Sequence, residues 1–259
     1  MLYPSEGWRS RHFIRVCSTN VVAAEIANEG DPGHLWITAD EQTNGKARRG
    51  RKWISEHGNL YASLLLIDPV PANRLSNLPL VASLALHRTI TEFLPNNRQD
   101  LQCSLVIKWP NDLLFDGKKL SGLLLEATLD RYHRMAVIIG FGVNCAHSPD
   151  NPLYPATSLS EIGCSVNPMV LKKVLARHMA SELFLWNKGY GFNLTRKAWL
   201  ERAFGLGKQV IAKMDDYEVT GRFQTIDDEG FLILKKDDGS SQKISAADIF
   251  FGNLNDSKG

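Results

Sequence analysis

The chain has 259 residues, of which 44% are hydrophobic and 22% are charged, a composition typical of a globular protein and not of a disordered one. Thirty basic and 28 acidic residues leave a net charge of +2, which argues against a general binder of polyanions, because any excess of positive charge must be local. The four cysteines form no Cys-x-x-Cys pair, and no apolar run reaches the length of a membrane span. We therefore expect a cytoplasmic protein with reduced thiols and no membrane partner.

The chain opens with three predicted segments: a loose arm, a short strand and a helix. Proline and glycine without periodicity predict the arm, and an apolar run that Gly30 closes predicts the helix. Ser18, Thr19 and Asn20 stand directly before this helix. They can cap it, or one hydroxyl can cap it while a neighbour faces a ligand at the positive end of the helix. The three segments are residues 1–10, 13–16 and 21–27.

A run of positive charge follows the strand predicted over residues 35–39. Five of the seven residues from Lys46 to Lys52 are cationic, and like charges this close repel one another, so the run should be a mobile loop. A solvated loop is the usual interpretation of such a run. Here two predicted strands flank it and Trp53 ends it, which favours a lid that orders over an anionic ligand. The second flanking strand, residues 59–67, is apolar enough to be buried on both faces.

The middle of the chain brings polar residues to a strand end. Apolar residues at helical spacing predict a helix over residues 77–93, and a strand over 105–107 leads into the polar run at 108–112. Pro110 ends regular pairing, so the polar residues beside it should lie at the end of that strand.

A hairpin is predicted over residues 112–126, because Asp116-Gly117 is a strong type I′ turn signal between apolar segments. Alternation along the returning strand places Lys118 and Lys119 on opposite faces. Only one of them can therefore face a given pocket.

A further apolar strand at 135–139 runs into Gly140-Phe141-Gly142-Val143-Asn144, where glycine would let the backbone approach a ligand closely. An ordinary bulge or strand end is the alternative. Two more helices are predicted over residues 169–186 and about 194–203.

Short strands separated by turn signals fill the chain after residue 205, and they predict a small SH3-like β-barrel. The predicted fold is α+β: a mixed-sheet catalytic domain over residues 11–205 and the barrel over 206–259. The predicted barrel strands are residues 209–211, 217–223, 231–234, 242–244 and 248–250.

Four features together favour a site that binds a nucleotide and a carboxylate: a cationic lid, separated lysines, a strand-end Asn-Asp pair and a glycine-rich strand end. Activation of a carboxylate by ATP brings two anions together, which requires fixed positive charge and exclusion of water. A lysine supplies a point charge, arginines fork onto phosphate oxygens, and Mg²⁺ would arrive with the triphosphate.

Five blocks of residues resemble the biotin–protein ligases, in the right order and over roughly residues 11–250. The arginine-rich loop ending in Trp53 and the Lys-Trp-Pro-Asn-Asp run are the specific parts, and the related lipoate ligases share the fold without that run. The blocks are Ser18-Thr19-Asn20, Gln42 with 45–53, 108–112, 119–122 and 140–144.

The resemblance implies an ATP-dependent ligase that forms biotinyl-5′-AMP and transfers biotin to a lysine on the biotin-carrier domain of a carboxylase. It implies catalytic roles for Lys119 and Arg48, and it assigns no metal ligand. The biotin site would comprise Ser18, Thr19, Asn20, Gln42, Gly45, Lys46, Ala47, Arg48, Trp53, Lys119, Gly122 and Leu124. The nucleotide site would comprise Arg48, Arg49, Arg51, Trp53, Lys108, Asn111, Asp112, Lys119, Gly140, Gly142 and Asn144.

The chain departs from the family pattern in two places. The usual Gly-Arg-Gly-Arg opening of the loop is here Gly45-Lys46-Ala47-Arg48, from which we expect altered ordering of the loop and not lost activity. Members that also repress transcription carry a helix-turn-helix domain before the Ser-Thr-Asn block, whereas residues 1–17 are too few for three helices. We therefore expect no repressor activity and no nucleic-acid partner. The oligomeric state stays open between a monomer and a homodimer, since members of this family often pair through the central sheet.

Two other functions stay open. Lipoyl or octanoyl transfer, as a ligase or transferase, would use the same fold, and adenylation of biotin and lipoate separates the two. A nucleic-acid-binding module would use Arg48, Arg49 and Arg51 with the barrel. The net charge near zero and the lack of aromatic residues interleaved with these arginines argue against it.

Overall fold

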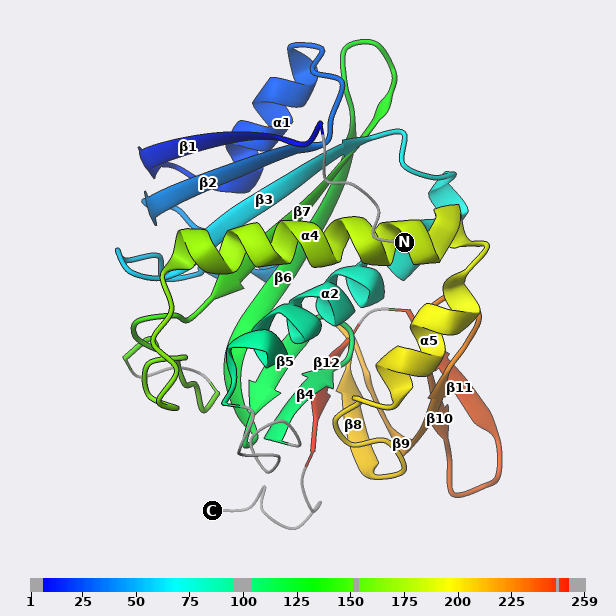
Figure 1. The fold of residues 1–259 in the computed structure, drawn as a ribbon. Helices are drawn as coiled ribbons and strands as arrows, with labels where there is room; N and C mark the ends of the chain where they lie inside the picture. Colours follow the sequence, from blue (N-terminus) through cyan, green and yellow to red (C-terminus); the bar gives the residue numbers. More distant parts are fainter. Residues whose placement is uncertain (1–6, 96–103, 151–153, 246, 252–259) are drawn as a thin grey trace.

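A computed structural model describes residues 7–95, 104–150, 154–245 and 247–251. In these ranges the chain forms a mixed seven-stranded sheet followed by a five-stranded antiparallel sheet, as the α+β prediction requires (Figure 1). No helix in the described ranges is long and apolar enough to span a membrane.

The large sheet has the strand order β1-β2-β3-β7-β6-β5-β4. Its β1–β2 pair is parallel, and its other neighbouring pairs are antiparallel. The strands are β1 (Arg9–Val16), β2 (Leu35–Gln42), β3 (Leu60–Ile67), β4 (Leu105–Lys108), β5 (Asp112–Phe115), β6 (Lys118–Leu129) and β7 (Met135–Val143).

Helices cover the two faces of this sheet unequally. Helix α1 packs on one face, α2 and α4 cover the other, and α5 packs against α2 and α4 (Figure 1). The central strand β3 is buried along nearly its whole length, which confirms the prediction that it is apolar on both faces. The helices are α1 (Thr19–Asn28), α2 (Leu78–Phe93), α4 (Pro168–Trp186) and α5 (Phe192–Leu200), with short 3₁₀ turns at Arg48–Gly50, Ala72–Asn77 and Asn187–Gly189.

The C-terminal sheet has the order β11-β10-β9-β8-β12, and its five strands confirm the short strands predicted there. Val210 and Phe223 of this sheet belong to the same buried apolar cluster as α2 and α4, so the two sheets share one core. The strands are β8 (Gln209–Lys213), β9 (Glu218–Ile226), β10 (Leu232–Lys235), β11 (Ser241–Ile244) and β12 (Asp248–Phe250).

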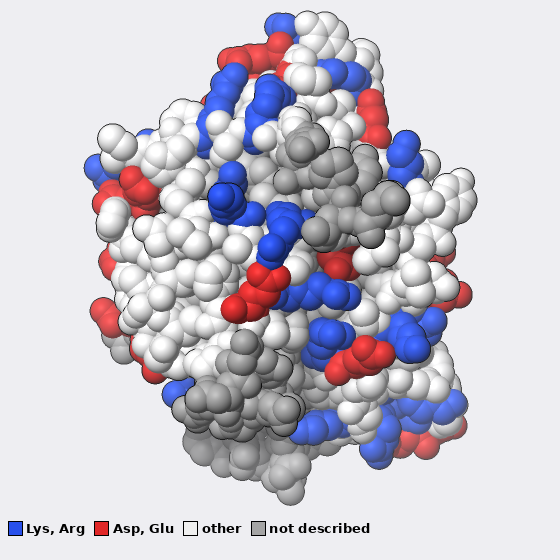
Figure 2. Space-filling model, in the orientation of Figure 1, with Lys and Arg blue, Asp and Glu red and all other residues white. Residues whose placement is uncertain are grey.

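Charged side chains are interspersed on the face that carries α2, α4 and α5. Lys and Arg lie among Asp and Glu there, and no broad patch of one sign covers this face (Figure 2). The arrangement agrees with a net charge of only +2.

Two predicted boundaries were wrong. Strand β1 begins at Arg9 and not at Phe13, so Arg9 and Ser10 belong to the sheet and not to the predicted arm, of which residues 1–6 lie outside the described residues. Most of its side chains are exposed because it is an edge strand, and it therefore has no hydrophobic period to detect. Helix α5 ends at Leu200 because residues 202–204 instead pair with Ile107 of β4.

The hairpin prediction is confirmed. Asp116 and Gly117 have φ angles of 48° and 76°, the left-handed values that a type I′ turn requires. The glycine-rich segment 140–144 forms the end of β7, whose last residue is Val143, so the strand-end alternative is confirmed and the bulge is not. Gly140 and Gly142 stay in regular register with both β3 and β6.

Candidate active site

A pocket of about 330 Å³ lies between the basic loop and the face of the sheet that carries α1. Its volume is in the range of small-molecule sites. All of the site residues predicted from the sequence line this pocket except Gly45, Arg49 and Lys108. The lining therefore combines residues from α1, the basic loop, β5, β6 and β7 that are distant in the sequence.

The floor of the pocket begins at the N-terminus of α1. Ser18 occupies the N-cap position but its side chain makes no capping hydrogen bond, so the capping interpretation was wrong. Gln42 of β2 replaces it, because its Oε1 accepts hydrogen bonds from the Thr19 amide at 2.8 Å and the Thr19 hydroxyl at 3.1 Å. Ser18 is thereby left in the pocket wall with its hydroxyl uncommitted to the helix.

The glycines of β7 make room for protein side chains. A Cβ atom at Gly140 would lie 2.4 Å from Asn20 Oδ1, and one at Gly142 would lie 2.5 Å from the indole of Trp53. The sequence predicted a close approach of a ligand here. In the structure, Asn20 and Trp53 make the close approach, and Trp53 also lies against Gly122 of β6.

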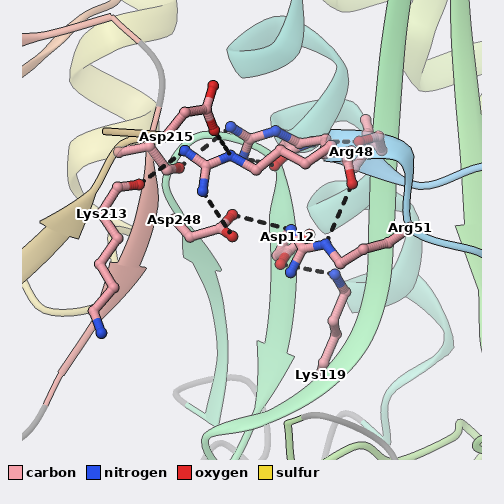
Figure 3. Close-up of polar contacts among 11 residues, drawn as sticks. Arg48, Arg51, Asp112, Lys119, Lys213, Asp215 and Asp248 are labelled. Carbon is pink, nitrogen blue, oxygen red and sulfur yellow. Dashed lines mark hydrogen bonds and ion pairs between the residues drawn. The ribbon is translucent and has the colours of Figure 1, made fainter. Parts of the chain in front are cut away.

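Lys119 projects into the pocket from the start of β6. Its Nζ donates to Asp112 Oδ2 at 2.9 Å (Figure 3). The same Nζ lies 5.5 Å from the centroid of the Trp53 ring. Lys118 is exposed and is not part of the lining, so only one of the two lysines faces the pocket, as alternation predicted. Lys119 is thus a cation that an ion pair with Asp112 fixes beside the aromatic ring of Trp53.

The basic loop is folded over the pocket as a small hairpin. Lys46 and Lys52 form an antiparallel bridge, and the Ala47 amide donates to the Arg51 carbonyl at 2.8 Å. Ala47 has a φ of −122°, an extended conformation that needs no glycine, so this departure from the family pattern is compatible with the folded loop.

Carboxylates of the C-terminal sheet hold the loop. Arg49 and Arg51 contact the two oxygens of Asp248 at 3.3 and 3.1 Å, and Arg49 also lies 3.5 Å from Asp215 (Figure 3). The sequence predicted a loop without partners until an anionic ligand arrived. The structure instead supplies anions from the same chain, and it turns Arg49 away from the lining toward them.

Arg48 is the most enclosed of the loop arginines. Its guanidinium donates to Asn111 Oδ1 at 3.4 Å and to the Ala247 carbonyl at 3.2 Å. Burial lowers its pKa from the ordinary arginine value, while Asp112 and Asp248 oppose that effect. A desolvated guanidinium of this kind is a strong partner for phosphate or carboxylate oxygens.

Lys108 and Gly45 lie behind the lining. Lys108 Nζ is 5.5 Å from the ring centroid of Tyr154 and 6.0 Å from that of Phe250, and burial lowers its pKa. A Cβ atom at Gly45 would lie 2.5 Å from Ser55 Oγ, so this glycine serves the base of the loop.

Several lining residues were missed from the sequence. Asp248 carries no local signal because tertiary folding alone brings β12 to the loop, and Tyr154 lies in a loop-rich stretch without periodicity. The sequence predicts Tyr61 as an ordinary core residue of a buried strand. In the structure its side chain reaches the pocket, and its hydroxyl donates to the Glu56 carbonyl.

The chain matches known sequence families over most of this architecture. Residues 13–144 match the Biotin/lipoate A/B protein ligase family, and residues 205–252 match the Biotin protein ligase C terminal domain. These two segments contain the pocket floor, the basic loop and the C-terminal strands that hold the loop.

Two curated relatives are similar over nearly the whole chain. The biotin–[acetyl-CoA-carboxylase] ligase of Paracoccus denitrificans is 38% identical over 251 residues, which cover 92% of this chain and 98% of that protein. The bifunctional ligase/repressor BirA of Bacillus subtilis (strain 168) is 32% identical over 243 residues, which cover 91% of this chain and 71% of that protein.

A solved structure has the same architecture. The biotin protein ligase from Aquifex aeolicus in complex with biotin and ATP superposes with a TM-score of 0.76 and 26% identity, covering 93% of this chain and 97% of that one. With the pocket, the loop and the C-terminal sheet in place, these similarities show that the chain belongs to the biotin protein ligase family.

Proposed function

We propose that this chain is a biotin–[acetyl-CoA-carboxylase] ligase that uses ATP to activate biotin and then attaches it to a lysine of a carboxylase's biotin-carrier domain. The observation that carries the proposal is one pocket in which a hydrogen-bonding floor meets Lys119 and the arginines of the basic loop. The relative from Paracoccus denitrificans supports the activity by its name.

The two ends of the pocket suit the two substrates. Ser18, Thr19 and Gln42 offer small polar groups for the ureido head of biotin, whereas Arg48 and Arg51 offer forked donors for phosphate oxygens. Lys119 lies between these sets, where the biotin carboxylate would meet the α-phosphate. Asn111, Asp112 and Asn144 would line the nucleotide end, with Tyr154 as a surface for the adenine.

Catalysis would consist mainly of positioning and charge stabilisation. A carboxylate oxygen of biotin attacks the α-phosphorus of ATP, the bond to the bridging oxygen breaks, and pyrophosphate leaves with the electron pair. Lys119 and Arg48 would stabilise the charge that builds on the α-phosphate oxygens, in a site from which the folded loop excludes water. The neutral amine of the acceptor lysine then attacks the acyl carbon, and AMP leaves as the amide forms.

Magnesium would enter as the complex with ATP and hence as part of the substrate. The described residues contain no group of three or more His, Cys, Asp or Glu side chains that could hold a metal ion. Asp112 and Asp248 face the pocket but are already paired with Lys119 and with Arg51. We therefore assign no resident metal site.

The test is exchange of labelled pyrophosphate into ATP, which should require biotin, followed by labelling of a purified biotin-carrier domain. Lipoate and octanoate serve as comparison substrates, because the matched family also includes lipoate ligases. Exchange that depends on lipoate and not on biotin would replace the proposed substrate, and absence of exchange from the folded protein would refute the activity.

A further inference from the structure

A continuous chain of hydrogen bonds runs beneath the pocket floor, and three of its members lie outside the pocket lining. Ser63, fully buried in β3, lies 2.6 Å from Asn20 Oδ1 and 2.7 Å from Thr19 Oγ1. Asn20 Nδ2 in turn donates to Glu126 Oε2 at 2.7 Å. Ser63 and Glu126 thus contact two residues of the floor from below.

The direction of each hydrogen bond in this chain follows from the acceptor at its end. Glu126 Oε2 accepts from Asn20 Nδ2, so Asn20 presents its amide nitrogen to Glu126 and its carbonyl oxygen to Ser63. Ser63 must then donate to Asn20, which leaves its lone pairs to accept from Thr19. Thr19 has one hydroxyl proton, and both Gln42 Oε1 and Ser63 Oγ lie within hydrogen-bond distance of its oxygen. Either of them can take that proton, so it is committed to the protein, and the Thr19 oxygen is left to accept a ligand N–H.

The same chain continues to the base of the basic loop. Gln42 Nε2 donates to Ser55 Oγ at 2.9 Å, and Ser55 Oγ donates to the Trp53 carbonyl at 2.9 Å. Backbone hydrogen bonds from Gln42 to Ser55 and from Trp53 to Gly45 close the two ends of the loop at the same place. A side chain at Gly45 would occupy this junction, since its Cβ would lie 2.4 Å from the Trp53 carbonyl.

We infer that Ser63, Glu126 and Ser55 are positioning residues, and that the chain of hydrogen bonds they complete links occupancy of the biotin head-group site to the conformation of the basic loop. This inference rests on the proposed function. Ser63 and Glu126 fix the orientation of the Thr19 and Asn20 side chains. Ser55 connects Gln42, which a bound head group would contact, to the backbone from which Trp53 and the loop extend.

The floor is tested by Ser63→Ala, with Ser121→Ala as the matched control. Ser121 is equally buried, in the neighbouring part of the sheet, but its hydroxyl has no hydrogen-bond partner among the residues that the structure describes. Titration calorimetry should show about tenfold weaker biotin binding for Ser63→Ala, because buried polar groups lose a partner. Ser121→Ala should bind as wild type does, and the KM for ATP should be unchanged in both variants.

Glu126 supplies a second test that does not depend on a fully buried position, because this side chain is only partly buried. Glu126→Gln keeps an oxygen that can accept from Asn20, whereas Glu126→Ala removes it. The KM for biotin should rise several-fold in the alanine variant and should be largely restored in the glutamine variant. Equal KM values for wild type and both variants would overturn the assignment of Glu126.

The link to the loop is tested by Ser55→Ala and limited trypsin digestion, since the loop offers five basic cleavage sites. Biotin should slow cleavage of wild type, and it should give Ser55→Ala about threefold less protection at saturating biotin. Full protection of Ser55→Ala would overturn the link. Wild type that fails to bind biotin would refute the proposed function, whereas a working wild type with unaffected Ser63→Ala and Ser55→Ala variants would refute only this inference.

Discussion

The floor of the pocket and the loop above it are stabilised in different ways. In the floor, Thr19, Asn20 and Ser63 are each less than 5% exposed and are joined by neutral hydrogen bonds. Over the pocket, Arg51 and Asp248 keep 34% and 19% of their side chains exposed and are joined by charge. The floor is therefore preorganised, whereas ion pairs of this exposure are weak and exchangeable.

This difference matches what the two substrates require. A ureido group is neutral and needs donors and acceptors in fixed directions, which a buried network supplies. A triphosphate is highly charged and can compete with Asp248 for the arginines. The C-terminal carboxylates thus keep the arginines close to the pocket without binding them tightly.

The largest expected effect lies where the two regions meet. Lys119→Ala should lower the rate of biotin-dependent pyrophosphate exchange by about 100-fold or more, because it removes a fixed charge from the transition state. The matched control is Lys118→Ala, which alters the neighbouring lysine outside the lining and should leave the rate unchanged. A Lys119→Ala enzyme with the wild-type rate and an intact circular dichroism spectrum would remove this lysine from the mechanism.

Mild acid should lower the stability of the folded domain that carries the pocket floor. Burial lowers the pKa of His87 from 6.5 to about 4, and its Nε2 lies 3.0 Å from the Leu105 carbonyl. The folded state therefore favours neutral His87. Its contribution to the free energy of unfolding is complete above pH 6.5, and this free energy falls by about 3 kcal/mol as the pH drops to 4.

Urea unfolding at pH 7.0 and pH 5.0 measures this effect. His87→Gln can still donate to the Leu105 carbonyl but cannot titrate, so its midpoint should change less between the two pH values. Burial also raises the pKa of Glu182 and lowers the pKa of His178, but wild type and His87→Gln both carry these two groups, so the difference between the two proteins isolates His87. An equal change in wild type and His87→Gln would show that other groups govern the acid response.

Opening of the loop should have an intermediate effect. Arg48→Gly removes the guanidinium that contacts Asn111 and the Ala247 carbonyl, and it adds backbone freedom to the loop. Biotinyl-5′-AMP should escape, so that labelling of lysines on a bystander protein such as serum albumin increases about tenfold. Labelling that stays confined to the carrier domain would show that Arg48 does not retain the intermediate.

The smallest effect should be at the loop's ion pairs. Asp248→Ala should raise the rate of trypsin cleavage in the loop by a few-fold without ligand, because each exposed pair contributes only about 0.2–1 kcal/mol. Asp215→Ala should raise the cleavage rate less, since Asp215 is 84% exposed and lies 3.5 Å from Arg49.

Salt gives a direct comparison of the two regions. Sodium chloride at about 0.5 M should speed cleavage of wild type more than that of Asp248→Ala, while biotin binding without ATP should hardly change. Equal salt dependence of loop cleavage and biotin binding would contradict the distinction between the floor and the loop.

Local patterns predicted much of the fold. The turn at Asp116-Gly117, the burial of β3 and the selection of Lys119 over Lys118 all follow from short-range geometry, namely positive φ angles and alternation. The start of β1 could not be predicted, because an exposed edge strand lacks a hydrophobic period.

The neighbours of several site residues could not be predicted either. Gln42 replaces Ser18 as the cap of α1, Trp53 fills the space over Gly142, and Asp248 pairs with Arg51 across 197 positions of sequence. Each of these contacts joins two segments that are distant in the chain, and no pattern within a single sequence indicates that such segments touch.

The sequence by itself determined which residues are available for this chemistry: a dense set of cations, a hydrogen-bonding cluster before a helix and a lysine at a strand start. These features depend on residue type and on spacings of a few residues, which local geometry converts directly into structure. The tertiary structure alone decided what each of them touches. Only tertiary packing brings β12 to the loop and places Ser63 beneath Thr19. The fold therefore decided which residues orient the floor side chains and which carboxylate pairs with the arginines.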